Sequence, residues 1–270
     1  MYKRQDEHIV IMDSFIDTLT TNSVYLEGVS VIGATSGGGK SFFIINQAYH
    51  SWKQGKDVVI FSLEMSDLQV ESRLLSLMTG VPNNDIIASR RYEKPIPLSK
   101  QDQDKLDKAR EELNSDKTAN IYVESSEFNS GTIKDTIKYY AREHNVSLFI
   151  IDYLQLITYK ESSWQAKSEY VRELKILSTQ LGCVILCPSQ VHMEKTTDGG
   201  LTFKTTGTIE LFNSSSLGLL LYAPPDLVDT DFIELHVVKN RHGITPVVNL
   251  KKNLAVSRFE DAGINQEDFT

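Results

Sequence analysis

The chain has 270 residues, 40% of them hydrophobic and 24% charged, so it is long enough for one large α/β domain or two small ones. Its 28 basic and 36 acidic residues give a net charge of −8, which argues against a protein that coats duplex DNA through overall charge. A few local lysines could still bind nucleic acid, because phosphate contacts are local. No window approaches the roughly 18 apolar residues of a membrane span, and the N-terminus lacks a secretory cleavage pattern. We expect a cytoplasmic protein with no membrane partner.

Apolar runs of strand length alternate with helical patterns along the chain. The predicted strands are 29–34, 57–63, 120–123, 147–152, 183–188, 217–222, 232–238 and 245–250. The predicted helices are 41–54, 100–114, 130–144 and 163–181. Another predicted helix opens with Ser66 and Gln69 in capping-box spacing and stops at Gly80. The proline-containing segment 82–98 and the polar segment between 188 and 217 are predicted as loops.

The predicted strands are apolar throughout rather than at every second residue. This pattern indicates an α/β fold with a mostly parallel twisted sheet and helices on both faces. The last three predicted strands lack intervening helices, so we expect them to form an antiparallel C-terminal edge. Cys183 and Cys187 lie four residues apart in one apolar run. On a strand they would be about 13 Å apart, too far for a disulfide, so we expect two buried free thiols.

The segment GATSGGGKS, Gly33 to Ser41, lies between a predicted strand and a predicted helix. Glycines in such a turn let backbone N–H groups point inward at a phosphate, and the helix N-terminus adds partial positive charge. In this context Lys40 would reach the β and γ phosphates, and the hydroxyl of Ser41 would bind Mg²⁺. The segment therefore predicts a Walker A phosphate loop for ATP or GTP, formed by Ala34, Thr35, Ser36, Gly37, Gly38, Gly39, Lys40 and Ser41. Its first position is Ala34 rather than glycine, and Gly33 comes one residue earlier.

Five further segments occur in the order seen in replicative hexameric helicases of the DnaB type. They are FSLEM (61–65), IDYLQL (151–156), PSQ (188–190), TGTIE (206–210) and KNRHG (239–243). The chain resembles the C-terminal motor domain of that family over about residues 15–260. The resemblance implies a RecA-like P-loop fold that binds ATP and Mg²⁺, assembles as a ring (a hexamer) on single-stranded DNA and works with a loader or primase.

The resemblance assigns roles to three residues that follow predicted strands. Asp152 ends an apolar strand that we expect beside the phosphate-loop strand, where its carboxylate can hold Mg²⁺. Glu64 would activate the attacking water, and Gln190 would sense the γ-phosphate. The alternatives are a turn-capping aspartate, a glutamate stabilised by the dipole of a following helix, and a solvated glutamine.

Arg241 and Lys239 match the family's arginine finger and its companion lysine, which act on the neighbouring subunit's nucleotide. Their alternative is solvation at a turn. Two segments, 157–168 and 191–206, match the loops that hold single-stranded DNA in the channel of the ring. The candidate DNA-binding residues there, each of which could instead be an ordinary surface lysine, are Lys160, Lys167, Lys195 and Lys204.

The chain departs from the family pattern in three places. After Glu210 it reads LFNSSS where the family has aspartates, and Lys204 stands where the family has an arginine. Nothing resembling the family's collar domain or linker helix precedes residue 15. We therefore divide the chain into an unassigned extension (1–14), a motor domain (15–260) and a tail (261–270). We expect a fragment, a chain that assembles through its motor surface alone, or one that relies on a partner. The expected function is an ATP-dependent DNA helicase motor of replication. The alternatives are a RecA-type switch ATPase in recombination or signalling, and a non-catalytic nucleotide-binding assembly factor.

Overall fold

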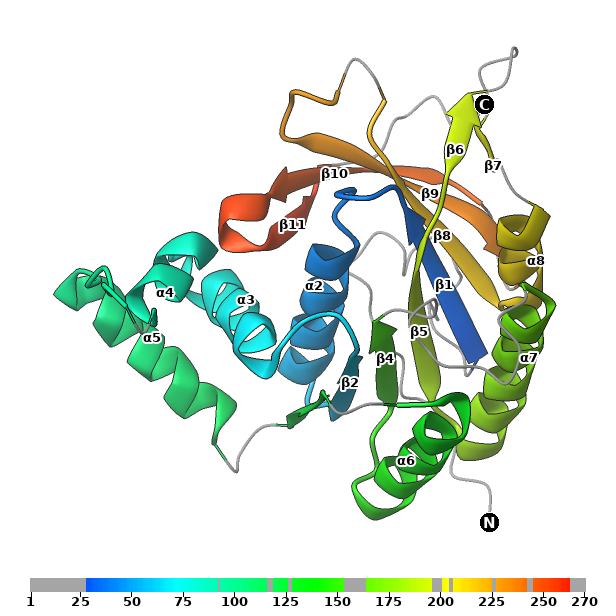
Figure 1. Cartoon of the computed structure of the whole chain (residues 1–270), viewed down its shortest axis with the longest axis horizontal. Helices are drawn as coiled ribbons and strands as arrows, with labels where there is room; N and C mark the ends of the chain where they lie inside the picture. Colours follow the sequence, from blue (N-terminus) through cyan, green and yellow to red (C-terminus); the bar gives the residue numbers. More distant parts are fainter. Residues whose placement is uncertain are drawn as a thin grey trace.

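A computed structural model of the chain describes residues 28–91, 93–115, 119–125, 128–152, 164–195, 201–203, 206–224, 227–241 and 245–262. These residues form a nine-stranded sheet with helices on both faces and a separate two-stranded hairpin (Figure 1). The predicted fold class is confirmed. None of the helices in this described part has the length and apolar character needed to cross a membrane.

The strand order of the sheet is β11-β10-β9-β8-β1-β5-β4-β2-β3. The strands span Gly28–Ala34 (β1), Val58–Ser62 (β2), Ile121–Glu124 (β3), Leu148–Asp152 (β4), Val184–Gln190 (β5), Leu217–Tyr222 (β8), Phe232–Asn240 (β9), Val247–Asn253 (β10) and Arg258–Asp261 (β11). The six strands from β3 to β8 run parallel, and β9, β10 and β11 continue the sheet antiparallel. The carboxyl ends of the parallel strands therefore lie along one edge of the sheet.

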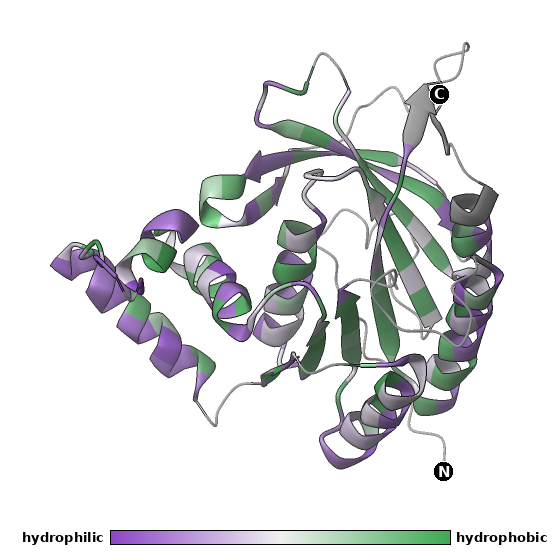
Figure 2. Cartoon of the chain, in the orientation of Figure 1, coloured by the Kyte–Doolittle hydropathy of each residue, from purple (hydrophilic) through white to green (hydrophobic). Residues whose placement is uncertain are grey.

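The helices are α2 (Lys40–Lys53), α3 (Asp67–Thr79), α4 (Asn83–Ser89), α5 (Lys100–Leu113), α6 (Ser130–Glu143), α7 (Trp164–Leu181) and α8 (Thr206–Ser214), with a 3₁₀ turn at Leu254–Val256. Figure 1 shows α2 and α3 on one face of the sheet and α6, α7 and α8 on the other. Successive residues of each central strand enter the two different cores, as Val31 and Ile32 do. This explains why the strands are apolar throughout, and Figure 2 shows them hydrophobic along their length.

The start and end of α3 follow its sequence signals. The backbone N–H of Ser66 donates to the side-chain oxygen of Gln69 at 2.9 Å, as the capping box requires. Gly80 ends the helix with φ 72° in the left-handed region. Both cysteines are buried and free, as predicted.

Four parts of the fold differ from the prediction. Residues 82–98 contain the helix α4, because Pro82 stands just before its first residue, where proline removes no needed hydrogen bond. The polar segment before residue 217 contains the hairpin of β6 (Met193–Lys195) and β7 (Leu201–Phe203) and then α8. Because α8 makes a crossover connection, β8 pairs parallel to β1 instead of starting an antiparallel edge. β11 is an additional strand.

Candidate nucleotide site

The segment predicted as a phosphate loop lies between β1 and α2. Gly37 and Gly39 have φ of 73° and 90°, which only glycine adopts without strain. The N–H of Gly38 donates to the carbonyl of Thr35 at 3.0 Å and closes the turn. The left-handed residue Gly39 then stands as the N-cap of α2, whose first residue is Lys40. The free N–H groups at this helix start form an anion-binding end.

The structure explains why glycine stands at 33 and alanine at 34. A Cβ at Gly33 would lie 2.9 Å from the ring of Phe212 and 3.0 Å from both Leu220 and Val191. Glycine is therefore needed at this position for packing, because a side chain would displace three buried neighbours. Ala34 is fully buried at the end of β1. The shift from the usual first glycine leaves the phosphate-binding turn intact.

A pocket of about 190 Å³ opens against this loop. Lys40 reaches back within it, with Nζ 3.4 Å from the carbonyl oxygens of Ala34 and Thr35. Burial lowers the pKa of Lys40, while Asp152 and Glu64 act in the opposite direction. The pocket thus brings together six of the eight predicted loop residues, all except Ala34 and Thr35, and two of the predicted catalytic residues. Its lining is Ser36, Gly37, Gly38, Gly39, Lys40, Ser41, Phe42, Glu64, Arg73 and Gln190.

Gln190 and Glu64 reach the pocket from different strands. Gln190 ends β5 and is the register partner of Ala34, so it lies beside the start of the phosphate loop. Glu64 is exposed in the turn after β2. The hydroxyl of Ser62 donates to the carbonyl of Met65 at 2.6 Å and holds this turn. Both side chains line the space that a ligand would fill.

Asp152 is the buried acid of the site. It ends β4, and its carbonyl accepts a hydrogen bond from the N–H of Leu63 at 2.9 Å. Burial raises its pKa to about 6, with Glu64 adding to the shift and Lys40 and Arg73 opposing it. Its Oδ2 is buried without a hydrogen-bond partner among the described residues. An orphaned carboxylate oxygen that shares the electrostatic environment of Lys40 and Glu64 is suited to Mg²⁺.

The predicted position of the Asp152 strand was wrong in one respect. β4 does not lie beside the phosphate-loop strand, because β5 stands between β4 and β1. The carboxylate still reaches the site, since all three strands are parallel and end at the same edge.

Arg73 is a pocket residue that no sequence motif identified. It lies on α3, and its guanidinium carbon is 4.5 Å from the ring centroid of Phe42. Burial lowers its pKa, and its Nη1 has no hydrogen-bond partner in the described structure. A buried guanidinium nitrogen without a hydrogen-bond partner is costly, and an anionic ligand could satisfy it. The only sequence signal is an arginine within the buried face of a predicted helix.

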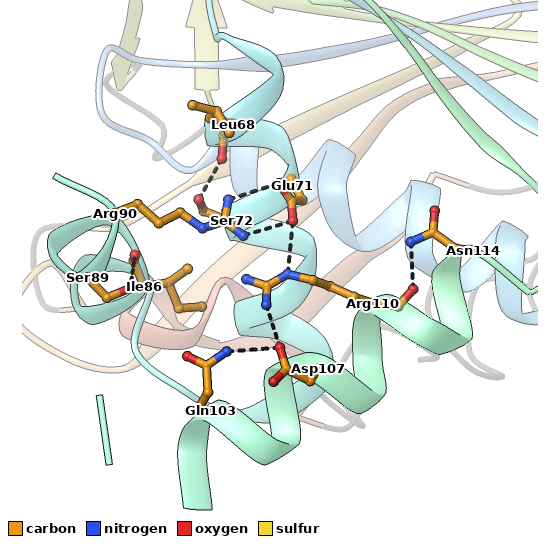
Figure 3. Close-up of polar contacts among 10 residues, drawn as sticks. All are labelled: Leu68, Glu71, Ser72, Ile86, Ser89, Arg90, Gln103, Asp107, Arg110 and Asn114. Atoms are coloured by element: carbon orange, nitrogen blue, oxygen red, sulfur yellow. Dashed lines mark hydrogen bonds and ion pairs between the residues drawn. The ribbon is translucent and has the colours of Figure 1, made fainter. Parts of the chain in front are cut away.

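The helix α3, which carries Arg73, is held by hydrogen bonds from Arg90 and Arg110 to Glu71. Glu71 of α3 accepts two hydrogen bonds from Arg90, at 2.9 and 2.8 Å, and a longer one from Arg110 of α5 (Figure 3). The Arg90 hydrogen bonds contribute most to lowering the pKa of Glu71. This network and a small apolar core around Ile86 and Leu106 connect α3, α4 and α5.

An apolar pocket of about 310 Å³ lies on the other side of the loop glycines. Its walls include Leu221, Tyr222, Val228 and Phe259. The two pockets share Ser36 and the three glycines, so a polar phosphate site adjoins an apolar one. A nucleotide, with anionic phosphates and a flat base, has the matching chemistry.

Arg241 and Lys239 lie away from the nucleotide pocket. Arg241 lines a separate pocket with Arg172, Lys175 and Glu210, and none of its lining residues belongs to the phosphate-loop pocket. Lys239 donates to three backbone carbonyls at the end of α8. Burial lowers the pKa of Lys239 to about 8, and the charges of Arg241 and Lys175 add to the effect.

The structure describes two of the four predicted DNA-binding lysines. Lys160 and Lys204 lie outside the described residues. Lys195 is the last residue of β6 in the hairpin. Lys167 lies near the start of α7, where partial burial lowers its pKa.

The chain matches the DnaB-like helicase C terminal domain over residues 14–261. It belongs to this family. Its relatives include the "Replicative DNA helicase DnaB" of Geobacillus stearothermophilus, 27% identical over 235 residues, which are 82% of this chain and 49% of the relative. Another is the "Replicative DNA helicase DnaC" of Bacillus subtilis (strain 168), 26% identical over 256 residues, or 87% of this chain and 54% of the relative. A third, DnaB of Mycobacterium leprae (strain TN), is 28% identical over 215 residues, which are 74% of this chain and 33% of the relative.

The chain thus spans between a third and about half of the length of these relatives. Two solved structures share its fold. One is a separately solved ATPase domain, which superposes with a TM-score of 0.78 at 21% identity, covering 96% of this chain and 94% of that domain. The other, a DnaB-like replicative helicase studied with its interactions with primase, superposes with a TM-score of 0.81 at 22% identity, covering 95% of this chain and 64% of that one. The RecA-like motor fold of this family is confirmed.

Replacing Asp152 with asparagine should stabilise the protein at pH 8 while abolishing Mg²⁺-dependent nucleotide binding. The folded state raises the pKa of Asp152, so this group's contribution to stability is complete below pH 4 and is lost as pH rises through about 6. Urea unfolding without Mg²⁺ should show a gain of up to about 3 kcal/mol at pH 8. The gain should vanish at pH 4, and an equal effect at both pH values would contradict this electrostatic account.

Arg73→Met should weaken ATP binding by about tenfold or more, because the guanidinium is a pocket cation with an unpartnered nitrogen. The change should not lower thermal stability, since methionine keeps apolar contact with Phe42 and removes a buried nitrogen that has no hydrogen-bond partner among the described residues. Arg142→Met, at an exposed site on α6, is the matched control. ATP affinity is measured by calorimetry. Equal affinities in the two variants would show that Arg73 does not contribute to ATP binding.

Proposed function

We propose that this chain is the ATP-driven motor of a replicative DNA helicase, which moves on single-stranded DNA as a ring, a hexamer. The observation that carries the proposal is the single pocket uniting Lys40, Ser41, Glu64 and Gln190 against a left-handed glycine turn, with Asp152 buried beside it. Family membership and the names of the relatives support a role in replication. We also propose residues 15–260 as the motor unit, flanked by an extension (1–14) and a tail (261–270), in a cytoplasmic protein.

In this proposal the site hydrolyses ATP as a Mg²⁺ complex. The N–H groups of the turn and Lys40 bind the phosphates, and Ser41 and Asp152 hold the metal. Mg²⁺ would neutralise charge on the β and γ phosphates. Glu64 orients the attacking water and accepts its proton, while Gln190 contacts the γ-phosphate side of the pocket.

Arg241 acts on the nucleotide of the neighbouring subunit. Arg241 lines a different pocket from the phosphate loop of its own subunit, which supports this role. A guanidinium opposite the developing charge on the γ-phosphate accelerates hydrolysis by about 10³–10⁵-fold in GTPases. Lys239 is proposed as its companion. Single-stranded DNA would contact Lys160, Lys167, Lys195 and Lys204, and a loader or primase would bind the assembled ring.

ATP hydrolysis measured across a protein titration, with and without a single-stranded oligonucleotide, tests this function. Activity should rise more steeply than linearly with protein, since each site needs a neighbour, and DNA should stimulate it. Lys40→Ala should lose nucleotide binding while keeping its fold. Hydrolysis that rises linearly with protein and does not respond to DNA would favour a switch ATPase. ATP binding without hydrolysis would favour a non-catalytic assembly factor.

Mixing two inactive variants tests the shared interface. Arg241→Ala subunits keep Glu64, and Glu64→Ala subunits keep Arg241, so mixed assemblies should contain some complete sites. We expect hydrolysis to reappear in the mixture to roughly a quarter of the wild-type rate if subunits assort randomly. No recovery at high protein concentration, with assembly verified by light scattering, would refute hydrolysis in trans.

A further inference from the structure

The proposed role of Arg241 requires a second copy of this chain to lie against the phosphate-loop pocket. The side chains around Arg241 should then face those around Glu64 of the next copy. Within one chain, α3 lies on one face of the sheet and α7 and α8 lie on the other (Figure 1). A contact between the start of α3 and the outer surface of α7 therefore joins two chains.

The surface around Arg241 contains a lysine that lacks an ion-pair partner among the described residues. Arg172, Lys175 and Arg241 line one pocket of about 490 Å³. Arg172 pairs with Glu169 at 3.0 Å, while Glu210 lines the pocket without forming an ion pair with Lys175. Partial burial lowers the pKa of Lys175, and the charge of Arg241 lowers it further. A carboxylate from outside the chain would relieve this repulsion.

The turn after β2 offers such a carboxylate. Glu64, Asp67 and Leu68 line an opening of about 460 Å³. Glu64 also lines the nucleotide pocket, where it is assigned to the attacking water. Asp67 is the exposed first residue of α3 and forms no ion pair within the described part of the chain. Because Asp67 follows Glu64 by three residues, a cation beside the arginine that approaches the nucleotide is brought close to Asp67.

Each of the two surfaces also exposes a large aliphatic side chain. Leu68, next to Asp67, is 62% exposed, and Ile176, next to Lys175, is 60% exposed. They are two of the three most exposed large hydrophobic side chains in the part of the chain that the structure describes. One such residue alone is ordinary on a protein surface. Here both surfaces combine an aliphatic group with a charge, and the two charges are opposite, as in a contact with an apolar centre and a polar rim.

We propose that Lys175 and Ile176 of one copy contact Asp67 and Leu68 of the next, and that this contact places Arg241 at the neighbouring nucleotide. The inference rests on the proposed function for the role of Arg241 and names the side chains that hold the two copies together. Lys175 and Asp67 are positioning residues, since neither lines the phosphate-loop pocket. Because the two surfaces differ, the contact is head to tail.

Exchanging the two charges tests the contact. Asp67→Lys and Lys175→Glu should each raise the protein concentration at half-assembly by about tenfold or more, because each places like charges together. The double variant restores an opposite pair at every contact and should assemble nearly as well as the wild type. Assembly is measured by sedimentation velocity of the full chain across a protein titration, without nucleotide and with Mg²⁺ and a non-hydrolysable ATP analogue.

The matched controls are Asp104→Lys and Lys108→Glu, at exposed positions of α5. Both should assemble like the wild type. A double variant whose defect is the sum of the two single defects would overturn the pairing of Asp67 with Lys175. Wild-type assembly in both single variants would also overturn it, as would a wild type that assembles in neither condition.

A second pair of variants leaves every charge in place. Leu68→Ser and Ile176→Ser should each weaken assembly by about threefold or more, because the contact loses buried apolar area. Neither should lower the thermal stability of the single chain, since both side chains are exposed. Assembly equal to that of the wild type in both variants would refute the apolar part of the contact.

ATP hydrolysis separates this inference from the proposed function. If the charge exchange restores assembly but the wild type shows no DNA-stimulated hydrolysis, the proposed function fails and the contact stands. If the wild type hydrolyses ATP with a steep dependence on protein while the double variant stays as defective as the single variants, the contact fails and the function stands. If Lys175→Glu weakens binding of a single-stranded oligonucleotide but not assembly, this surface binds DNA and the proposal is refuted.

Discussion

The parallel register of β1, β5, β4 and β2 is the constraint on which the site depends. Parallel strands end at one edge of a sheet, and here the register pairs Ala34 with Gln190 and Ser62 with Asp152. Residues from four separate segments therefore meet above the strand ends without any of them being near in sequence. The glycine turn supplies phosphate-directed N–H groups only because it starts from this edge.

The buried charges of the phosphate-loop pocket lower the stability of the ligand-free fold. Asp152 is buried beside Glu64, while Arg73 and Lys40 are cations whose pKa values burial lowers. Each charge is partly compensated by the others, but one oxygen of Asp152 and one nitrogen of Arg73 have no hydrogen-bond partner among the described residues. A metal–polyphosphate ligand supplies both a cation for the carboxylate and anions for the arginine. Binding of such a ligand would relieve the unfavourable burial of these charges, and this relief would contribute to the affinity for the ligand.

The pocket around Arg241 lies on the face of the sheet that α7 and α8 cover. It shares no lining residue with the phosphate-loop pocket. It is lined by Arg172, Lys175, Arg241 and the acidic residue Glu210, and Arg172 also pairs with Glu169 at 3.0 Å. The same molecule therefore presents a phosphate-binding pocket and a separate cationic surface. This arrangement suits a repeated head-to-tail contact between identical subunits, in which one surface completes the other's site. The helix α8 contacts both regions, through the ring of Phe212 at Gly33 and through Glu210 beside Arg241.

The sequence determined much of this protein by itself. Local patterns predicted the α/β class and the strand–glycine turn–helix, because turn geometry and apolar runs depend on neighbouring residues. The resemblance to the helicase family, rather than a local pattern, pointed to Glu64 and Gln190. Tertiary structure alone decided the direction of β8, the place of Arg73 in the pocket and the partners of Lys239. Lys239 contacts the segment 212–215, and Gly33 contacts Phe212. Such contacts join residues far apart in the chain, and no local pattern encodes which distant side chain will fill a given space.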